Sequence, residues 1–371
     1  MQIVQLSHYM PPHIGGIEFV AQLVARGLAA RGHGVTWFGS APGHATQAPS
    51  EGDNPRIVNV PALNWPERRF GLPYPVWSPT FLPALRRALR SADCVIAHDC
   101  LYPGTLAAAA LRGSCRFVVV QHVAEVDFGP WVTPLERLAY RSLGRRVLER
   151  AEHVICCSAP VQEWLQQTLG VRSPCSLVPN GIEEGSFAVV TAARRQQLRE
   201  KWQLSGRNLL FVGRLVEKKC LPRVLAALAQ LAPDISLVVV GEGPLSHLVR
   251  ERARVRYLGA RSRADVAELA SASDAFVLVS QGEGLPLSLQ EALLSGLPAV
   301  VSDEPAFVAN LRGAPGVQFV GAGEPLEPVL EAALDTVERE PIAAWARARY
   351  GRVAFLDAYE RILTGGVAGP S

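Results

Sequence analysis

Short apolar runs alternate with amphipathic segments along the chain. The first run covers residues 2–7, and in the segment that follows, residues 17–30, apolar side chains recur every three to four positions. A short run of this kind predicts a buried strand, whereas the recurring spacing predicts a helix with one apolar face. Residues 35–38 form the next apolar run, so the chain opens with a strand–helix–strand unit, which is typical of α/β proteins with parallel sheets.

The same order recurs between residues 274 and 302. An apolar run at 275–279 predicts a strand, a polar turn with two glycines follows, and a helical pattern begins at about Pro286, which suits a first helical turn. The unit therefore places a turn and a helix N-terminus at the carboxyl edge of a parallel sheet, where open α/β sheets bind ligands. The free N–H groups of such a helix suit a phosphate.

Two carboxylates lie in this unit, Glu283 in the turn and Glu291 in the expected helix. They are about two helical turns apart, which is too far to share a proton. The spacing suits hydrogen bonds from hydroxyl groups at the two ends of one elongated polar ligand. The alternative is that both are solvated charges near a helix end, and the spacing alone does not decide between these interpretations.

The residues around the two acids carry a family resemblance. Residues 283–286 read Glu-Gly-Leu-Pro, seven residues separate Glu283 from Glu291, and residues 296–298 read Gly-Leu-Pro. This arrangement closely resembles the signature of retaining nucleotide-sugar glycosyltransferases of the group 1, family 4 type, and residues 11–38 are similar to the family's first strand–helix–strand unit. The resemblance implies the GT-B fold, an α/β architecture with two Rossmann-like domains and a cleft between them.

Length and motif positions predict the domain organisation. A chain of 371 residues is long enough for two domains that each bury a core. A Pro-Asn-Gly turn at 179–181 stands where the family changes domain. The resemblance therefore implies an acceptor-side domain over residues 1–182, a donor-side domain over residues 183–354, and a C-terminal helix, residues 355–371, that crosses back to the N-terminal domain.

Cations follow the first strand of the second domain. Gly213 and Arg214 come directly after an apolar run, and Lys218 and Lys219 follow shortly afterwards. Two cations beside a helix N-terminus suit a diphosphate, because charge-assisted hydrogen bonds contribute roughly 1.5–3 kcal/mol each. The segment matches the family's Gly-Arg-Leu…Lys-Gly pattern, with Lys219 as the expected lysine and Lys218 as its competitor. Cys220 departs from the pattern, since it stands where glycine is usual.

The first domain offers fewer candidates. Gly15 and Gly16 lie in the loop after the first strand, where the family's glycine pair contacts donor phosphate or acceptor. His122 follows a predicted strand and resembles, by position, the family histidine that reaches the donor sugar. The alternative for a lone histidine is a purely structural role. His98 and Asp99 form a weaker candidate of the same kind.

The resemblance implies a role for each candidate. Arg214 and Lys219 would neutralise the leaving diphosphate. Glu291 would bind the ribose hydroxyls, and Glu283 would bind the donor sugar. The complete set has His122, Arg214, Lys219 and Glu283 as catalytic candidates, and Gly15, Gly16, Gly213, Gly284, Leu285, Pro286 and Glu291 as donor-binding candidates. No acid–nucleophile pair typical of retaining glycosidases is evident, so a same-face attack assisted by the leaving phosphate is expected.

The charged residues are unevenly spread. The net charge is +3, and basic residues outnumber acidic ones in residues 1–180. Within the amphipathic segment 134–150, Arg137, Arg141 and Arg145 share one helical face, which is either a solvated surface or a site that docks on an anionic membrane. No dense basic helix with interleaved aromatic residues occurs, so nucleic acid is not an expected partner.

Composition predicts the cellular compartment of the expected enzyme and bears on its acceptor and cofactors. Apolar runs stay well below 18 residues, the N-terminus has no signal-peptide pattern, and seven cysteines show no metal-ligand spacing. These features predict a cytoplasmic protein with reduced thiols, possible attachment to the inner membrane face, and an acceptor that is lipid-linked or a saccharide of the cell envelope. No Asp-x-Asp motif occurs, so no metal or other cofactor is expected. A nucleotide-sugar epimerase, a phosphorylase and a non-catalytic nucleotide-sugar-binding protein remain as alternatives.

Overall fold

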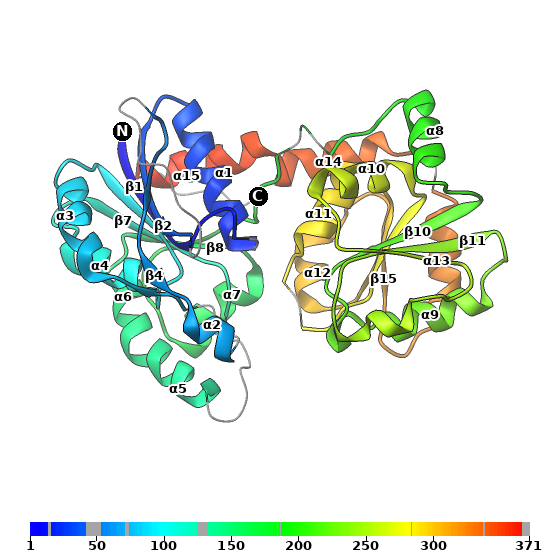
Figure 1. Ribbon diagram of the computed structural model, residues 1–371, viewed down its shortest axis with the longest axis horizontal. Coiled ribbons are helices and arrows are strands. Elements are labelled where there is room, and N and C mark those ends of the chain that lie inside the picture. Colours follow the sequence, from blue (N-terminus) through cyan, green and yellow to red (C-terminus); the bar gives the residue numbers. More distant parts are fainter. Residues whose placement is uncertain are drawn as a thin grey trace. The chain divides into compact units, whose positions relative to one another are not determined.

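The computed structural model divides into two compact units, residues 1–181 with 355–371 (unit 1) and residues 182–354 (unit 2). Each unit is described by itself (Figure 1). The structure describes residues 1–13, 16–41, 53–70, 74–124, 132–183, 185, 187–282, 284–336 and 338–365. Within these residues, no helix combines the length and apolar character that are needed to cross a bilayer.

Unit 1 is built on a seven-stranded parallel sheet with the order β3-β2-β1-β6-β7-β8-β9. Its strands are β1 (Gln2–Tyr9), β2 (Gly34–Ser40), β3 (Arg56–Asn59), β6 (Cys94–His98), β7 (Arg116–Gln121), β8 (His153–Cys156) and β9 (Cys175–Leu177). A separate antiparallel hairpin pairs β4 (Ala62–Leu63) with β5 (Val76–Trp77). The apolar runs form buried strands because their neighbours in the sheet and the helices cover both faces.

Helices cover this sheet, and one of them comes from the end of the chain. They are α1 (Gly16–Ala30), α2 (Trp65–Phe70), η1 (Pro79–Phe81), α3 (Leu82–Arg90), α4 (Pro103–Leu111), α5 (Val132–Ala139), η2 (Tyr140–Gly144), α6 (Arg145–Glu149), α7 (Ala159–Glu163), η3 (Trp164–Thr168) and α15 (Arg352–Leu363). Leu356 and Tyr359 of α15 are buried in the same core cluster as Val24 of α1, and α1 and α15 lie side by side (Figure 1).

Unit 2 repeats the architecture with a six-stranded parallel sheet of order β12-β11-β10-β13-β14-β15. The strands are β10 (Arg207–Val212), β11 (Ile235–Val240), β12 (Val255–Gly259), β13 (Ala275–Leu278), β14 (Ala299–Ser302) and β15 (Val317–Val320). The helices are α8 (Ala192–Lys201), η5 (Glu217–Lys219), α9 (Leu221–Gln230), η6 (Pro244–Leu248), α10 (Arg263–Ala272), α11 (Leu287–Leu294), α12 (Pro305–Leu311), α13 (Glu327–Leu334) and α14 (Glu340–Tyr350).

Three details differ from the pattern-based expectations. Pro286 is the residue before α11 and has extended backbone, so the helix begins at Leu287 rather than at the proline. The C-terminal helix α15 begins at Arg352 rather than at the expected residue 355, directly after Gly351, whose extended backbone ends α14. The segment 134–150 contains a π turn, η2, between α5 and α6, because its backbone hydrogen bonds there span five residues.

Candidate functional site

The loops after β10 and β11 meet closely at the carboxyl edge of the unit 2 sheet. Gly213 N donates to Val240 O at 3.0 Å, and Leu215 N donates to Glu242 O at 2.9 Å. Gly241, with φ of 130°, allows this approach, because a Cβ atom there would lie 1.9 Å from the carbonyl oxygen of Gly213. Because Gly213 and Gly241 have no side chains, a ligand above this sheet edge would contact their backbone directly.

Lys219 is the lysine that faces this edge. A Cβ atom placed on Gly213 would lie 3.6 Å from Lys219 Nζ, and the Lys219 side chain is buried. Lys218 and Arg214 are exposed. The backbone of Lys218 serves another purpose, since its carbonyl oxygen accepts a 2.8 Å hydrogen bond from Gln281 N, which joins the loops after β10 and β13.

The backbone conformation of Cys220 shows why glycine is usual at this position. The residue lies between η5 and α9 with φ of 50° and ψ of 34°, which is the left-handed region that favours glycine. The loop therefore keeps a glycine-like backbone despite its side chain. Burial raises the pKa of the Cys220 thiol, so the thiol is uncharged at neutral pH.

The N-terminus of α11 lies directly after this loop system. Gly284, Leu285 and Pro286 lead into the helix, and Pro286, the residue before its first turn, makes no side-chain capping hydrogen bond. The N–H groups of a first helical turn and the positive end of the helix dipole suit an anion. Glu283 lies outside the described residues, so its expected place in the turn is not seen.

Glu291 is buried in the second turn of α11, and its partner was not expected. Arg263 Nε donates to Glu291 Oε1 at 2.8 Å, and the Arg263 guanidinium lies 5.0 Å above the Phe187 ring. Burial raises the pKa of Glu291, and the charge of Arg263 opposes that increase. The contact joins residues that are 28 positions apart, so no local sequence pattern reveals it.

In unit 1, His122 lies directly after β7, at the carboxyl edge where it was expected. Its Nε2 atom is 2.8 Å from His98 Nδ1, and its Nδ1 atom is 3.3 Å from Cys157 Sγ. Both contacts are satisfied when Cys157 donates its S–H to Nδ1 and Nε2–H donates to His98. Burial lowers the pKa of His122 to about 3, so the ring is neutral near pH 7. A hydrogen bond to a sugar would compete with one of these two neighbours.

A second polar cluster lies after β1. His13 Nδ1 is 3.1 Å from Glu18 Oε1, and His13 Nε2 is 3.3 Å from Glu67 Oε1. Glu18 is buried in the first turn of α1, whose first residue is Gly16. Gly15 lies outside the described residues. Within the residues that the structure describes, no three His, Cys, Asp or Glu side chains are grouped as metal ligands.

Sequence comparisons relate both units to one group of enzymes. Residues 14–185 match the family model described as Glycosyltransferase Family 4, and residues 194–312 match the model described as Glycosyl transferases group 1. The chain is a group 1 glycosyltransferase family member.

Relatives named as glycosyltransferases align with different shares of the chain. EpsF of Bacillus subtilis, named as a glycosyltransferase, is 31% identical over 241 residues, which cover 60% of this chain and 62% of EpsF. A GDP-mannose-dependent α-mannosyltransferase of Mycobacterium tuberculosis is 27% identical over 319 residues, which cover 79% of this chain and 76% of that protein. The chain thus spans less than two thirds of EpsF.

Solved structures confirm the expected GT-B fold. Sucrose-phosphate synthase from Thermosynechococcus elongatus superimposes on the chain with a TM-score of 0.79 at 18% sequence identity. The superposition covers 98% of each of the two chains. HepE from Anabaena, solved in complex with UDP, gives a TM-score of 0.74 at 18% identity and covers 98% of this chain and 100% of HepE. These likenesses concern the fold alone.

Proposed function

We propose that the protein is a retaining glycosyltransferase that moves a sugar from a nucleoside diphosphate sugar to a hydroxyl group of a lipid-linked or saccharide acceptor. The observation that carries the proposal is the edge of the unit 2 sheet, where Lys219 faces the bare backbone of Gly213. The loop that holds the lysine is joined to the loop that leads into the N-terminus of α11. This combination of cation, open backbone and helix dipole suits a diphosphate.

Each residue of this edge has a role in the proposed reaction. Lys219 and the exposed Arg214 stabilise the negative charge that grows on the diphosphate as its bond to the anomeric carbon breaks. The N–H groups at the start of α11 act in the same direction. Glu291, held by Arg263, accepts hydrogen bonds from the ribose hydroxyls, because a carboxylate can accept from two neighbouring hydroxyl groups.

The transfer itself is proposed to occur on one face of the sugar. The bond between the anomeric carbon and the phosphate oxygen breaks, the acceptor oxygen bonds to the same carbon from the same side, and the acceptor proton passes to the leaving phosphate. This route needs no enzyme nucleophile, and retention gives an α-linked product from an α-linked donor. Relatives named as α-mannosyl- and α-1,3-galactosyltransferases are consistent with such products. That His122, Glu283, Gly15 and Gly16 contact the donor, and that no metal is required, remain predictions.

The donor base is the first property to measure. The names of relatives include both GDP-mannose and UDP-galactose donors, so the family does not choose the base. We would titrate the full chain with UDP, GDP, ADP and dTDP by calorimetry. One nucleotide is expected to bind with micromolar affinity, and Arg214→Ala and Glu291→Ala should each weaken its binding at least tenfold. Arg252→Ala, at an exposed arginine of the same unit, is the matched control and should change little.

The outcomes separate the proposal from its alternatives. Binding of one nucleotide followed by transfer from its sugar to an added acceptor supports the transferase. Binding without turnover over any acceptor favours a non-catalytic binding protein, and isomerised donor without acceptor favours an epimerase. If no nucleotide binds to the folded chain, the proposed donor site is wrong. A β-linked product from an α-linked donor would contradict retention.

A further inference from the structure

The loops after β6 and β7 hold the backbone of His122 in place. Asp99 N donates to Val120 O at 2.8 Å, and Asp99 Oδ1 accepts from His122 N at 3.0 Å. Beside them, Gln121 Oε1 accepts from Cys100 N at 3.2 Å. Because these hydrogen bonds join the two loops at the carboxyl edge of the unit 1 sheet, the His122 side chain starts from a fixed position. The contacts of its ring then determine which nitrogen atom a ligand can use.

His98, the last residue of β6, holds the His122 ring at one nitrogen. Its Nδ1 atom lies 2.8 Å from His122 Nε2, and the planes of the two rings differ by 18°. The His98 side chain is completely buried, and its Nε2 atom has no hydrogen-bond partner within the described residues. Since a ring in a closely packed interior has little freedom to turn, His98 offers Nδ1 alone to His122.

Cys157, directly after β8, contacts the other nitrogen of the His122 ring. Its Sγ atom lies 3.3 Å from His122 Nδ1 and has no second hydrogen-bond partner in the part of the chain that the structure describes. Cys157 is buried in the same core cluster as Phe355 and Tyr359 of α15, whereas His122 is only partly buried. A thiol is a weak donor and a weak acceptor. A ligand can therefore reach His122 and displace Cys157 more easily than it can displace His98.

The two unequal partners favour one proton position on His122. Burial lowers the pKa of His122 to about 3 and also lowers the pKa of His98, so at neutral pH each ring has one donor and one acceptor nitrogen. With its proton on Nε2, His122 donates to an imidazole nitrogen and accepts the Cys157 S–H. With its proton on Nδ1, it would donate to sulfur, a weaker acceptor, and the S–H would have no acceptor within the described residues. The first arrangement therefore has the stronger hydrogen bonds.

We propose that His98 is a positioning residue that fixes the proton of His122 on Nε2 and thereby keeps Nδ1 as an acceptor for a hydroxyl group of the donor sugar. The hydroxyl replaces the Cys157 S–H, and the hydrogen bond from His122 Nε2–H to His98 stays intact. The sugar contact rests on the function proposed above, whereas the proton position is a property of the chain without ligand. The two parts can therefore be tested separately.

Nitrogen NMR of the full chain, isotopically labelled in its histidine rings, measures the proton position without any ligand. The His122 signals are assigned by their absence in His122→Gln, and the parent is expected to carry the proton on Nε2. His98→Asn should keep it there, because the asparagine oxygen can replace the Nδ1 acceptor, whereas His98→Leu should give a mixture of both tautomers. Cys157→Ala should leave the proton on Nε2, since His98 still accepts it.

A matched control separates this effect from a general loss of packing. His153 is another buried histidine of the same sheet, and its Nε2 atom lies 2.8 Å from Ser176 Oγ, so His153→Leu should leave the His122 tautomer unchanged. If His98→Leu does not fold, a proton on Nε2 in the parent, His98→Asn and Cys157→Ala still supports the proposal. A proton on Nδ1 in the parent, a shift in Cys157→Ala but none in His98→Leu, or equal shifts in His98→Leu and the control would overturn it.

Transfer kinetics test the role of His98 in the reaction. His98→Leu should slow sugar transfer about tenfold, the effect expected for one neutral hydrogen bond, and His98→Asn should keep most of the parent rate. Because His98 acts through His122, the double variant His98→Leu/His122→Gln should be no slower than His122→Gln alone. Effects that multiply would overturn the positioning role. A chain that has the proton on Nε2 and transfers no sugar would contradict the proposed function and the sugar contact with it, while the proton position would stand.

Discussion

The carboxyl group of Asp99 is buried, and burial disfavours its charged form. The residue follows β6, has φ of 58°, and is buried. Its Oδ1 atom accepts a 3.0 Å hydrogen bond from His122 N, while Oδ2 is buried without a hydrogen-bond partner within the described residues. Burial raises the pKa of Asp99 from 3.8 to about 7, against the opposing effect of backbone N–H groups of His122 and Val123.

This pKa predicts how Asp99→Asn should behave. Because the folded pKa is above the unfolded one, Asp99 favours the folded state most below about pH 4, and that contribution is lost as the pH rises to about 7. Asparagine keeps the oxygen that accepts from His122 N and tolerates a positive φ. The stability of Asp99→Asn relative to the parent should therefore increase from pH 4 to 7, by at most about 4 kcal/mol, and stay level above.

Urea unfolding at a series of pH values measures this difference. The control is Asp93→Asn, at an exposed carboxylate that accepts a hydrogen bond from Gln2 N at 2.7 Å. Parallel pH profiles for the parent and Asp99→Asn would show that Asp99 does not carry the raised pKa.

At the residue scale, sequence reasoning could identify candidates where the chemistry is local. The loop glycines and the Arg214 and Lys219 pattern could be found because neighbouring residues define them. The contacts of Glu291 with Arg263 and of His122 with Cys157 could not, because each joins residues that only the folded sheet brings together. The roles of all the site residues in binding or catalysis remain predictions, and Glu283 and Gly15 lie outside the described residues.

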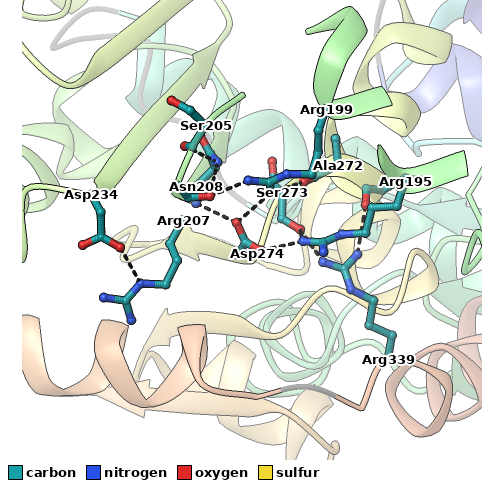
Figure 2. Close-up of polar contacts among 12 residues, drawn as sticks. Arg195, Arg199, Ser205, Arg207, Asn208, Asp234, Ala272, Ser273, Asp274 and Arg339 are labelled. Atoms are coloured by element: carbon teal, nitrogen blue, oxygen red, sulfur yellow. Dashed lines mark hydrogen bonds and ion pairs between the residues drawn. The ribbon is translucent and has the colours of Figure 1, made fainter. Parts of the chain in front are cut away.

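At the scale of elements, one carboxylate joins several elements at the edge of the unit 2 sheet opposite the edge that holds Gly213 and Lys219. Asp274, just before β13, accepts from Arg195 and Arg199 of α8 and, at 2.7 Å, from Asn208 N of β10 (Figure 2). Arg339 approaches the same place and donates to Ser271 O and Ser273 O near the end of α10. Burial, followed by repulsion from Arg195, lowers the pKa of Arg339 to about 10, which Asp274 partly opposes.

Asp274→Asn should destabilise unit 2 strongly. The change leaves the guanidinium groups of Arg195 and Arg199 without their shared carboxylate, and breaking a largely buried ion pair costs about 3 kcal/mol. Asp234→Asn is the matched control, since Asp234 pairs with Arg207 at 3.1 Å in the same region but is solvent-exposed (Figure 2). Thermal unfolding should show a large loss for the first variant and little change for the second. Similar losses of thermal stability in both variants would mean that Asp274 does not hold α8 and β10 together.

The elements themselves were predictable to different degrees. The strands at the start of the chain and at 275–278 follow from short apolar runs, because central parallel strands are buried on both faces. The π turn η2 and the interruption at Gly351 were not predicted. Periodicity does not reveal one extra residue in a turn, and a single glycine within a helical pattern does not by itself end a helix.

At the scale of the whole molecule, the last segment of the chain folds with unit 1, although unit 2 precedes it in the sequence. The first three residues of α15 belong to unit 2, and the remainder belongs to unit 1. Leu356 packs against α1 where Gly27 leaves room, since a Cβ atom at Gly27 would lie 2.4 Å from Leu356 Cδ1. Arg31 adds ion pairs at 2.8 Å to Asp357 and 2.7 Å to Glu360. Unit 1 is therefore completed by the last segment of the chain.

Two tyrosines nine positions apart should therefore report on different units. Tyr350 of α14 is buried in the unit 2 core, and Tyr359 of α15 is buried in the unit 1 core. Truncating either to alanine removes a large buried side chain and should cost about 3–5 kcal/mol in its own unit. In calorimetry and limited proteolysis, Tyr359→Ala should loosen unit 1 and leave the proposed nucleotide binding by unit 2 unchanged, whereas Tyr350→Ala should loosen unit 2. If both variants weaken the same unit, α15 does not complete unit 1, and the division of the chain at residue 354 is wrong.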